Sequence, residues 1–157
     1  MKRILVLLLS LCLALPVFCA AEETIAYTWS NANAAAVSGS FVTLDGAGMQ
    51  MLLPSDFISY PLSESEVASG LMAYCMTEDG EQVIAVRFLT QLPEGLTENV
   101  PVSVNGMEGL LGHDPSTDAI CLLLPTEDGR YVQFSFQPAD TMKELSDILI
   151  SSIQKIR

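Results

Sequence analysis

The chain has 157 residues, of which 19 are acidic and seven are basic, giving a formal net charge of −12. This length suffices for one domain with its own hydrophobic core. An acidic surface repels nucleic acid and anionic lipid at long range, so we expect neither class as a partner.

The N-terminal segment has the three parts of a secretory signal peptide. Lys2 and Arg3 precede an apolar run over residues 4–15, and Pro16 ends that run before a stretch of small residues. The run is shorter than the ~20 apolar residues that a membrane span needs. The pattern therefore predicts export of the chain.

Cleavage is expected after Ala21, because Cys19 and Ala21 then supply small side chains at the −3 and −1 positions that the signal peptidase recognises. Residues 1–21 would then be the signal peptide, and residues 22–157 a single domain without a membrane anchor. A cut after Ala20 and a lipid anchor on Cys19 are alternatives, and the bulky Phe18 disfavours both.

The first elements of the domain are predicted from short local patterns. Tyr27–Val37 is rich in alanine and asparagine and predicts a modest helix, which Gly39 ends. Phe41–Leu44 and Met49–Leu53 flank a short turn and are expected to be strands. Ser63 is placed to cap one helical turn in the polar stretch that follows.

Three hairpins follow, each marked by a turn that ends in glycine. Asn-Gly and Asp-Gly supply the positive φ angles of two-residue type I′ turns, so tight turns are expected at 78–80, 105–106 and 127–129. The strands expected around them are Leu71–Thr77 with Gln82–Leu89, Pro101–Val104 with Met107–Gly112, and Ala119–Leu124 with Arg130–Gln137. Thr90–Asn99 is predicted to be a loop.

The apolar patterns of two strands predict their surroundings. In the last strand, Val132, Phe134 and Phe136 alternate with polar residues, which predicts one buried and one wet face. Residues 120–124 are apolar throughout and predict a central strand covered on both faces.

The C-terminal segment predicts an amphipathic helix that packs on the sheet. Thr141 and Glu144 have capping-box spacing, and Asp140 is an alternative cap. The apolar stripe consists of Met142, Leu145, Ile148, Leu149, Ile153 and Ile156. Together these elements predict an α+β fold, with an antiparallel sheet of hairpins, an N-terminal helix and a C-terminal helix packed on the sheet.

His113 is the single histidine, and two hypotheses account for it. One places it with Asp114 and Asp118 in a metal site or an acid–base pair. The other, which we favour, places it in a solvated turn bent by Asp114 and Pro115, because one histidine and two aspartates fall short of a zinc ligand set.

The sequence contains no nucleophile elbow, phosphate loop or dinucleotide fingerprint. A pair of carboxylates could still serve glycoside hydrolysis, since the chain offers many acidic residues. We assign no catalytic, cofactor-binding or metal-binding residue and no cofactor, and we predict that the chain is not an enzyme.

Two features of the mature segment leave alternatives open. Cys75 and Cys121 lie in predicted strands and could form a disulfide or remain buried thiols. The Thr-Glu-Asp-Gly turns at 77–80 and 126–129 place acidic residues beside carbonyl groups, which keeps calcium binding as an alternative.

The order of these elements resembles PsbP-like domains, the α/β sandwiches that include the photosystem II extrinsic protein and the Mog-type Ran-binding protein. The resemblance is to their small secreted bacterial members. It covers about residues 29–156 and is carried by Gly-Ser-Phe-Val-Thr-Leu-Asp-Gly-Ala-Gly-Met-Gln-Met-Leu-Leu-Pro at 39–54, and by the final strand Phe134–Ala139 before the last helix.

The resemblance implies a PsbP-like sandwich and non-enzymatic binding or scaffolding, with no functional residues to carry over. The chain departs from the family where Thr90–Asn99 replaces a helix, so one face of the sheet should be less covered. We therefore expect a secreted or cell-envelope binding domain that uses this face or loop to contact an unknown protein or envelope component. A cation-binding envelope protein and a small hydrolase are the alternatives.

Overall fold

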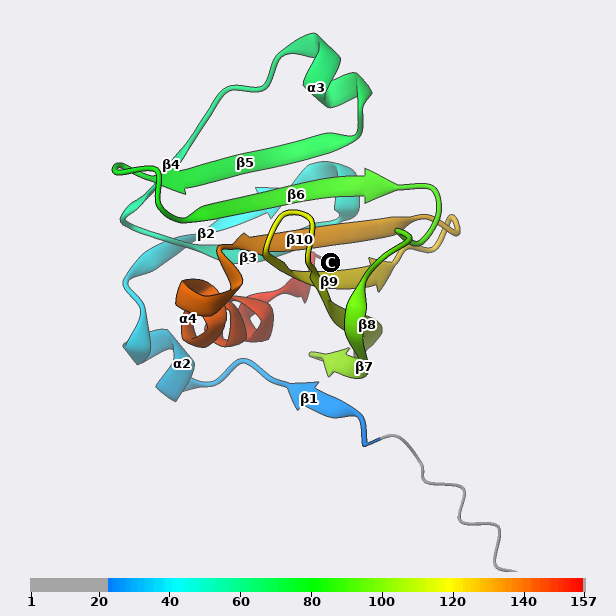
Figure 1. The fold of residues 1–157 in the computed structure, drawn as a ribbon. Helices are drawn as coiled ribbons and strands as arrows, with labels where there is room; N and C mark the ends of the chain where they lie inside the picture. Colours follow the sequence, from blue (N-terminus) through cyan, green and yellow to red (C-terminus); the bar gives the residue numbers. More distant parts are fainter. Residues whose placement is uncertain (1–22, 157) are drawn as a thin grey trace, which may run out of the picture.

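The computed structural model describes residues 23–156, which form two layers (Figure 1). One layer is an eight-stranded sheet, and the other consists of a three-stranded sheet and the helix α4 (Ala139–Ser152). The predicted signal peptide, residues 1–21, lies outside the described residues. Within residues 23–156, no helix is both long enough and apolar enough to cross a bilayer.

The large sheet is antiparallel except at one edge, where the first two strands run parallel. Its strands in spatial order are β1 (Ile25–Tyr27), β7 (Thr97–Val104), β8 (Met107–Asp114), β9 (Ala119–Pro125), β10 (Tyr131–Gln137), β6 (Val83–Leu89), β5 (Leu71–Thr77) and β4 (Phe57–Ser59). The small sheet has the order β11 (Gln154–Lys155), β3 (Met49–Pro54) and β2 (Gly39–Leu44). The three predicted hairpins are all present, whereas β1, β4 and β11 were not predicted.

The N-terminal helix is shorter than predicted. Tyr27 lies in β1 and pairs with Val104 of β7, so the prediction of a helix from Tyr27 is wrong at its start. The helix α2 (Asn31–Ala36) begins after Ser30, whose side chain accepts a hydrogen bond from the Asn33 amide. A pairing partner distant in sequence has overridden the local helical composition.

The helix α3 (Glu64–Ala68) forms as predicted from its cap. Ser63 Oγ accepts a hydrogen bond from the Glu66 amide, and the Glu66 carboxylate accepts one from the Ser63 amide, which completes a capping box. The Ser63 hydroxyl also donates a hydrogen bond to the Glu66 carboxylate, and this bond, followed by that of the Ser63 amide, lowers the pKa of Glu66 below its usual value. In Figure 1, α3 stands apart from both layers, at the end of the connection between β4 and β5.

The core lies between the two layers. In β10, Val132, Phe134 and Phe136 face the second layer and are fully buried. Their buried counterparts in the second layer include Met49, Met51 and Leu52 of β3, and Met142, Leu149, Ile150 and Ile153 in and just after α4. Burying one such side chain contributes about 1.5–3 kcal/mol, so α4 is an integral part of the core.

The outer face of the large sheet is covered at its centre. In β9, Cys121 and Leu123 face outward but are at most 1% exposed, which confirms the prediction of a strand buried on both faces. Gln133 and Ser135 of β10 also face outward and are only 9% and 7% exposed, so the predicted wet face is wrong here. The side-chain Nε2 of Gln133 donates hydrogen bonds to Cys121 Sγ (3.2 Å) and Ser135 Oγ (3.1 Å), which satisfies these buried polar groups.

The turns divide into two types. Asn105 and Gly106 have φ angles of 48° and 84°, which agrees with the predicted type I′ turn. In the two Thr-Glu-Asp-Gly turns, Gly80 and Gly129 have positive φ but the preceding Glu-Asp pairs do not. The loop is four residues long at 78–81, where Thr77 bonds to Gln82, and three residues long at 127–129, where Thr126 bonds to Arg130. In both loops glycine follows an ordinary type I turn, so the type I′ prediction is wrong for both.

The C-terminal helix forms on the predicted apolar stripe but has different ends. Pro138 precedes the first turn without a side-chain cap, so the predicted Thr141 capping box is wrong. The helix ends at Ser152 because the chain then extends to pair β11 with β3. Ile153 is buried as expected, although it follows the helix, whereas Ile156 is 42% exposed.

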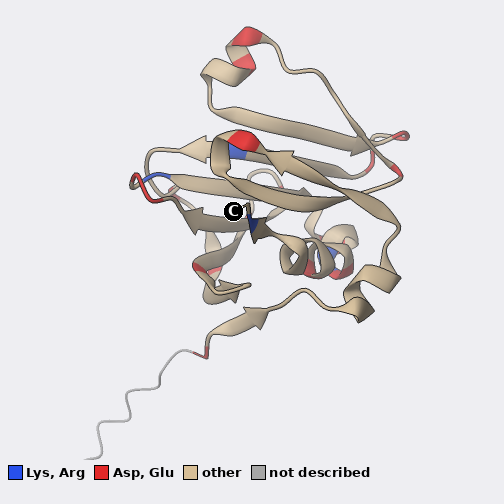
Figure 2. Cartoon of the chain, turned by 180° about the vertical axis from the view of Figure 1, so that it is seen from behind, with Lys and Arg blue, Asp and Glu red and all other residues tan. Residues whose placement is uncertain are grey.

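Acidic side chains lie mainly on turns and helices rather than on strands, as Figure 2 shows. The exceptions are Glu98 in β7 and Glu108 and Asp114 in β8. The β7–β8 hairpin is thus unusually rich in carboxylates for this sheet.

Candidate functional site

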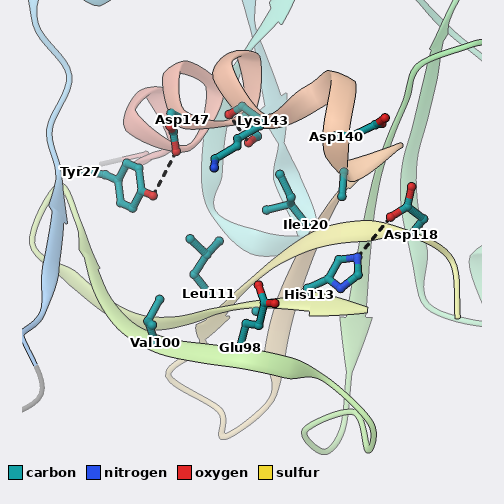
Figure 3. Close-up of a pocket in the computed structure, with 13 residues that line it drawn as sticks. Tyr27, Glu98, Val100, Leu111, His113, Asp118, Ile120, Asp140, Lys143 and Asp147 are labelled. Carbon is teal, nitrogen blue, oxygen red and sulfur yellow. Dashed lines mark hydrogen bonds and ion pairs between the residues drawn. The ribbon is translucent and has the colours of Figure 1, made fainter. Parts of the chain in front are cut away.

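A cavity of about 560 Å³ lies between α4 and the inner side of the β7–β8 hairpin (Figure 3). Other surface hollows have similar volumes, but this one gathers the most ionisable groups. Its lining consists of Tyr27, Glu98, Val100, Leu111, Gly112, His113, Asp118, Ile120, Ala139, Asp140, Lys143, Ser146 and Asp147. We treat it as the candidate site and call it the α4 cavity.

The floor of the α4 cavity is apolar. Val100 and Leu111 are paired across β7 and β8, and Ile120 extends the same surface from β9. Strands β7 and β8 shift register between Thr97 and Val100, and Glu98 within this bulge has a φ of 54°. A bulge re-aims side chains locally, and here it brings a carboxylate to the edge of an apolar floor.

His113 lies at the end of β8 and lines the cavity, so our preferred placement in a solvated turn is wrong. Its Nε2 lies 3.2 Å from Asp118 Oδ1, with the two side chains 31% and 60% exposed. Asp114, in contrast, accepts hydrogen bonds from the Ser116 amide and hydroxyl and from Thr117 Oγ1, which shapes the turn. His113 and Asp118 are thus brought together as an acid–base pair would require, and Asp114 is not part of it.

Tyr27 reaches the cavity from β1, at the opposite end from His113 (Figure 3). Its hydroxyl donates a hydrogen bond to Asp147 Oδ1 of α4 at 3.1 Å. Burial, followed by the charge and hydrogen bond of Asp147, raises the pKa of Tyr27 to about 12. The phenol therefore stays protonated at neutral pH and acts as a hydrogen-bond donor.

The cavity has a negative charge balance. Glu98, Asp118, Asp140 and Asp147 supply four carboxylates, against the ammonium group of Lys143 and a histidine that is neutral in its basic form. In Figure 3, Lys143 extends from α4 toward the cavity. Glu98 and Lys143 form no ion pair within 4.0 Å with any residue of 23–156.

The hydroxyl groups of the lining do not supply a nucleophile beside His113. The Tyr27 hydroxyl donates a hydrogen bond to Asp147. Ser146 is 1% exposed, and its hydroxyl donates a hydrogen bond to the Lys143 carbonyl oxygen. Cys75 and Cys121 lie outside the lining, and burial raises the pKa of both thiols. The hydroxyl groups of the lining and the two thiols of the described chain are thus each bonded or buried away from His113.

Cys75 and Cys121 are free thiols in the structure. They lie in β5 and β9, which β6 and β10 separate, so three strand spacings place them about 14 Å apart. They also face opposite sides of the sheet, whereas a disulfide needs Cα atoms within about 7 Å. The disulfide alternative is therefore wrong for this fold.

In each of the two Thr-Glu-Asp-Gly turns, the aspartate side chain accepts hydrogen bonds from residues of the same turn. Asp79 accepts hydrogen bonds from Thr77 Oγ1 and the Glu81 amide, and Asp128 is bound by Thr126 Oγ1 and the Arg130 side chain. The Arg130 bond is the largest factor that lowers the pKa of Asp128 to about 2. In the described part of the chain, no three His, Cys, Asp or Glu residues gather as a metal ligand set.

Comparison with known proteins supports the fold alone. No protein family profile and no curated protein sequence matches the chain. The solution structure of PsbP (CyanoP) from the cyanobacterium Synechocystis sp. PCC 6803 is similar, with a TM-score of 0.52 and 15% sequence identity. The similarity covers 76% of this chain and 93% of that protein. The fold is PsbP-like, as the sequence resemblance indicates.

Sequence reasoning missed most of the α4 cavity. Lys143 and Asp147 lie off the predicted apolar stripe of the last helix, but no pattern indicated what they face. Tyr27 was assigned to a helix, and Glu98 to a loop. The signal that could have found Glu98 is the Asn-Gly turn at 105–106. Extending both strands of that hairpin away from the turn places the strand segment with Glu98 alongside the segment with His113.

Proposed function

We propose that this chain is an exported, non-enzymatic binding domain whose α4 cavity takes an organic cation with an apolar body. The observation that carries the proposal is the combination of carboxylates with an apolar floor in one cavity. The PsbP-like fold is compatible with a binding role, but it does not identify a ligand.

Charge supports a cationic ligand. The carboxylates of the α4 cavity outnumber its cationic side chains, and the whole chain carries −12. An anionic ligand would be repelled at long range and would meet unpaired carboxylates on arrival. An ammonium group placed near Glu98 and Asp118 would gain charge-assisted hydrogen bonds.

The apolar floor supports a ligand with a hydrocarbon part. Val100, Leu111 and Ile120 are partly exposed to the cavity, and covering them contributes roughly 25 cal/mol per Å² of apolar area. A small hydrated metal ion would leave this floor exposed. An alkylammonium ion would pair its charge with the carboxylates and cover the apolar floor with its hydrocarbon chain.

The first test uses three six-carbon probes that differ in their head group, namely hexylammonium, 1-hexanol and hexanoate. Binding is measured by amide chemical shifts of residues that line the cavity. We expect hexylammonium to bind most tightly and hexanoate not to bind. Equal affinity for hexanoate would contradict the proposal.

Two charge variants test the site with opposite signs. Glu98→Gln should weaken hexylammonium binding about two- to five-fold, and Lys143→Met should strengthen it by a similar factor, as expected for exposed charges. Glu108→Gln is the matched control, because Glu108 is on the same hairpin but faces the outer side, opposite Ser103. Equal effects of both glutamate substitutions would show that the cavity is not the site.

The His113–Asp118 pair favours a second candidate function, hydrolysis by a water that His113 deprotonates. An activated ester such as p-nitrophenyl acetate distinguishes the two. Turnover above buffer that is lost in His113→Ala would contradict the non-enzymatic part of the proposal. Under our proposal, the two proteins hydrolyse the ester at the same rate.

Export is tested on the secreted protein itself. Expression of the full chain in a bacterial host should yield a protein in the periplasm or medium whose N-terminal residue is Glu22 by mass spectrometry. A chain that retains residues 1–21 in the membrane fraction would contradict export with cleavage.

A further inference from the structure

A second cavity, of about 510 Å³, lies on the opposite flank of the molecule, between the small sheet and the β5–α3 region. Its lining consists of Val42, Thr43, Leu44, Asp45, Gly46, Ser59, Leu62, Val67, Gly70, Leu71, Met72, Ala73, Cys75 and Phe88. Asp45 is the one charged residue among them. We call this cavity the β2 cleft.

The strand β2 forms one wall of the cleft and is an unpaired sheet edge. In the small sheet it pairs only with β3, through six residues in continuous register. The other edge strands among residues 23–156 are β1, β4 and β11, which have only two or three residues each. β2 is therefore the long free edge of the described fold.

Proteins usually protect such an edge with lysine, proline or a bulge, because its free amide and carbonyl groups can pair with another strand. β2 has the sequence Gly-Ser-Phe-Val-Thr-Leu, which contains none of these protecting features. By contrast, β1 covers the edge of β7 at the other side of the large sheet. The unprotected edge lies directly beside the β2 cleft.

We propose that the β2 edge and the β2 cleft together form a docking site for an extended peptide that carries apolar side chains at alternate positions and basic residues at its ends. The peptide adds a strand to β2 through main-chain hydrogen bonds. Side chains alternate across a strand, so every second one would lie over the cleft beside Val42 and Leu44.

The apolar walls determine the alternate side chains. Leu62 and Val67 form the α3 side of the cleft, and Met72 forms the β5 side. Val67 is 57% exposed, so its surface is available to a ligand. Methionine adapts its shape to different partners, so the cleft accepts aliphatic side chains of several sizes.

Charge complementarity determines the ends of the peptide. Asp45 lies at one end of β2, and α3 carries Glu64 and Glu66 in its first turn. No lysine or arginine lines the cleft. A second copy of this chain would bring the same acidic groups, and an anionic membrane would also be repelled, so a basic peptide is the favoured occupant.

This site does not depend on the proposed function of the α4 cavity, because the two share no lining residue. Amide chemical shifts distinguish them, since a peptide in the β2 cleft perturbs residues 40–44 and a cation in the α4 cavity perturbs residues 98–120. Failure of one proposal leaves the other standing.

The experiment uses the exported protein and the capped heptapeptide Lys-Thr-Val-Thr-Val-Thr-Lys. We expect the amides of β2 that point away from β3 to exchange more slowly with solvent when the peptide is bound. Methylating the peptide nitrogens that face β2 should weaken binding about tenfold or more, whereas methylating the opposite set should not. This contrast is specific to strand addition.

Two matched variants locate the site. Val67→Lys should weaken binding of the basic heptapeptide about two- to five-fold by like-charge repulsion. Ile25→Lys adds the same charge to an exposed aliphatic position on β1 and should have no effect. Both positions are exposed, so both variants should fold.

Any one of the following results would overturn the proposal. The first is unchanged exchange of the β2 amides at millimolar peptide. The second is equal affinity for a heptapeptide with glutamate in place of lysine, or an equal loss of affinity whichever of the two sets of peptide nitrogens is methylated. The third is a dimer in sedimentation that Val67→Lys dissociates, which would assign the cleft to a second copy.

Discussion

The side chain of Asn105 joins three parts of the fold that are distant in sequence. Its Nδ2 donates to the carbonyl oxygens of Ser151 (2.7 Å) and Ile153 (2.8 Å) at the end of α4. Its Oδ1 accepts from the Trp29 amide at 3.0 Å, and its own amide donates to the Tyr27 carbonyl oxygen. The β7–β8 turn is thereby fixed to both the N-terminal segment and the last helix.

Asn105→Asp removes the two donors but keeps an acceptor for Trp29 and a residue that tolerates positive φ. Each lost hydrogen bond costs about 1 kcal/mol, and a carboxylate facing carbonyl groups at the C-terminus of a helix costs about 0.3–1 kcal/mol more. We therefore expect a loss of about 2–3 kcal/mol in the free energy of unfolding. Asn105→Ala also loses the Trp29 contact and strains the backbone, so its loss should be larger, about 3–4 kcal/mol.

The assay is urea unfolding, followed by the fluorescence of Trp29 and by circular dichroism. Asn31→Asp, at an exposed position of helix α2, is the matched control and should change stability by less than about 0.5 kcal/mol. If Asn105→Asp were no less stable than this control, the assignment of Asn105 as the joint between α4, β1 and the hairpin would be refuted.

Five further outcomes are expected. Because the folded pKa of Tyr27 is about 12 against 10.0 for a free tyrosine, the stability that its neutral form provides is present below pH 10 and is lost between pH 10 and 12, which unfolding at increasing pH would reveal. Asp147→Asn should lower that pKa, as measured by phenolate absorbance. Leu149→Ala should cost about 2–5 kcal/mol in the free energy of unfolding, because this fully buried residue of α4 contacts the core. Cys75 and Cys121 should react with a thiol reagent only after denaturation, and millimolar calcium should leave the melting temperature unchanged, whereas a rise would revive the cation-binding alternative.

The local elements of the fold were largely predictable from sequence. Glycine turns and alternating strands are local signals, and they placed all three hairpins and the α3 cap within a few residues. The errors occur where a distant partner decides the conformation. Tyr27 is extended because it pairs with Val104, and the last helix stops at Ser152 because the next residues pair with β3.

The candidate site was not predictable by the same reasoning. His113 was noticed because it is the single histidine, but Asp147 and Tyr27, which line the same cavity, come from α4 and β1. Their proximity depends on how α4 crosses the sheet, which no local pattern encodes. Gln133 and Ser135 are a similar case, because their burial depends on what covers the outer face.

The positions of the two cavities follow from the widths of the two layers. Seven spacings across eight strands give the large sheet a width of about 34 Å. The second layer consists of one helix and three strands, which together cover about 20–25 Å. α4 contacts β9, β10 and β1, and Val102 and Val104 of β7 are fully buried, so the inner face is incompletely covered only beside the two cavities. At the β7–β8 flank the uncovered inner surface carries carboxylates above an apolar floor, and at the β5 flank it is almost wholly apolar beside a free strand edge. The proposed cation site and the proposed peptide site thus occupy the two places where the second layer leaves the inner face uncovered.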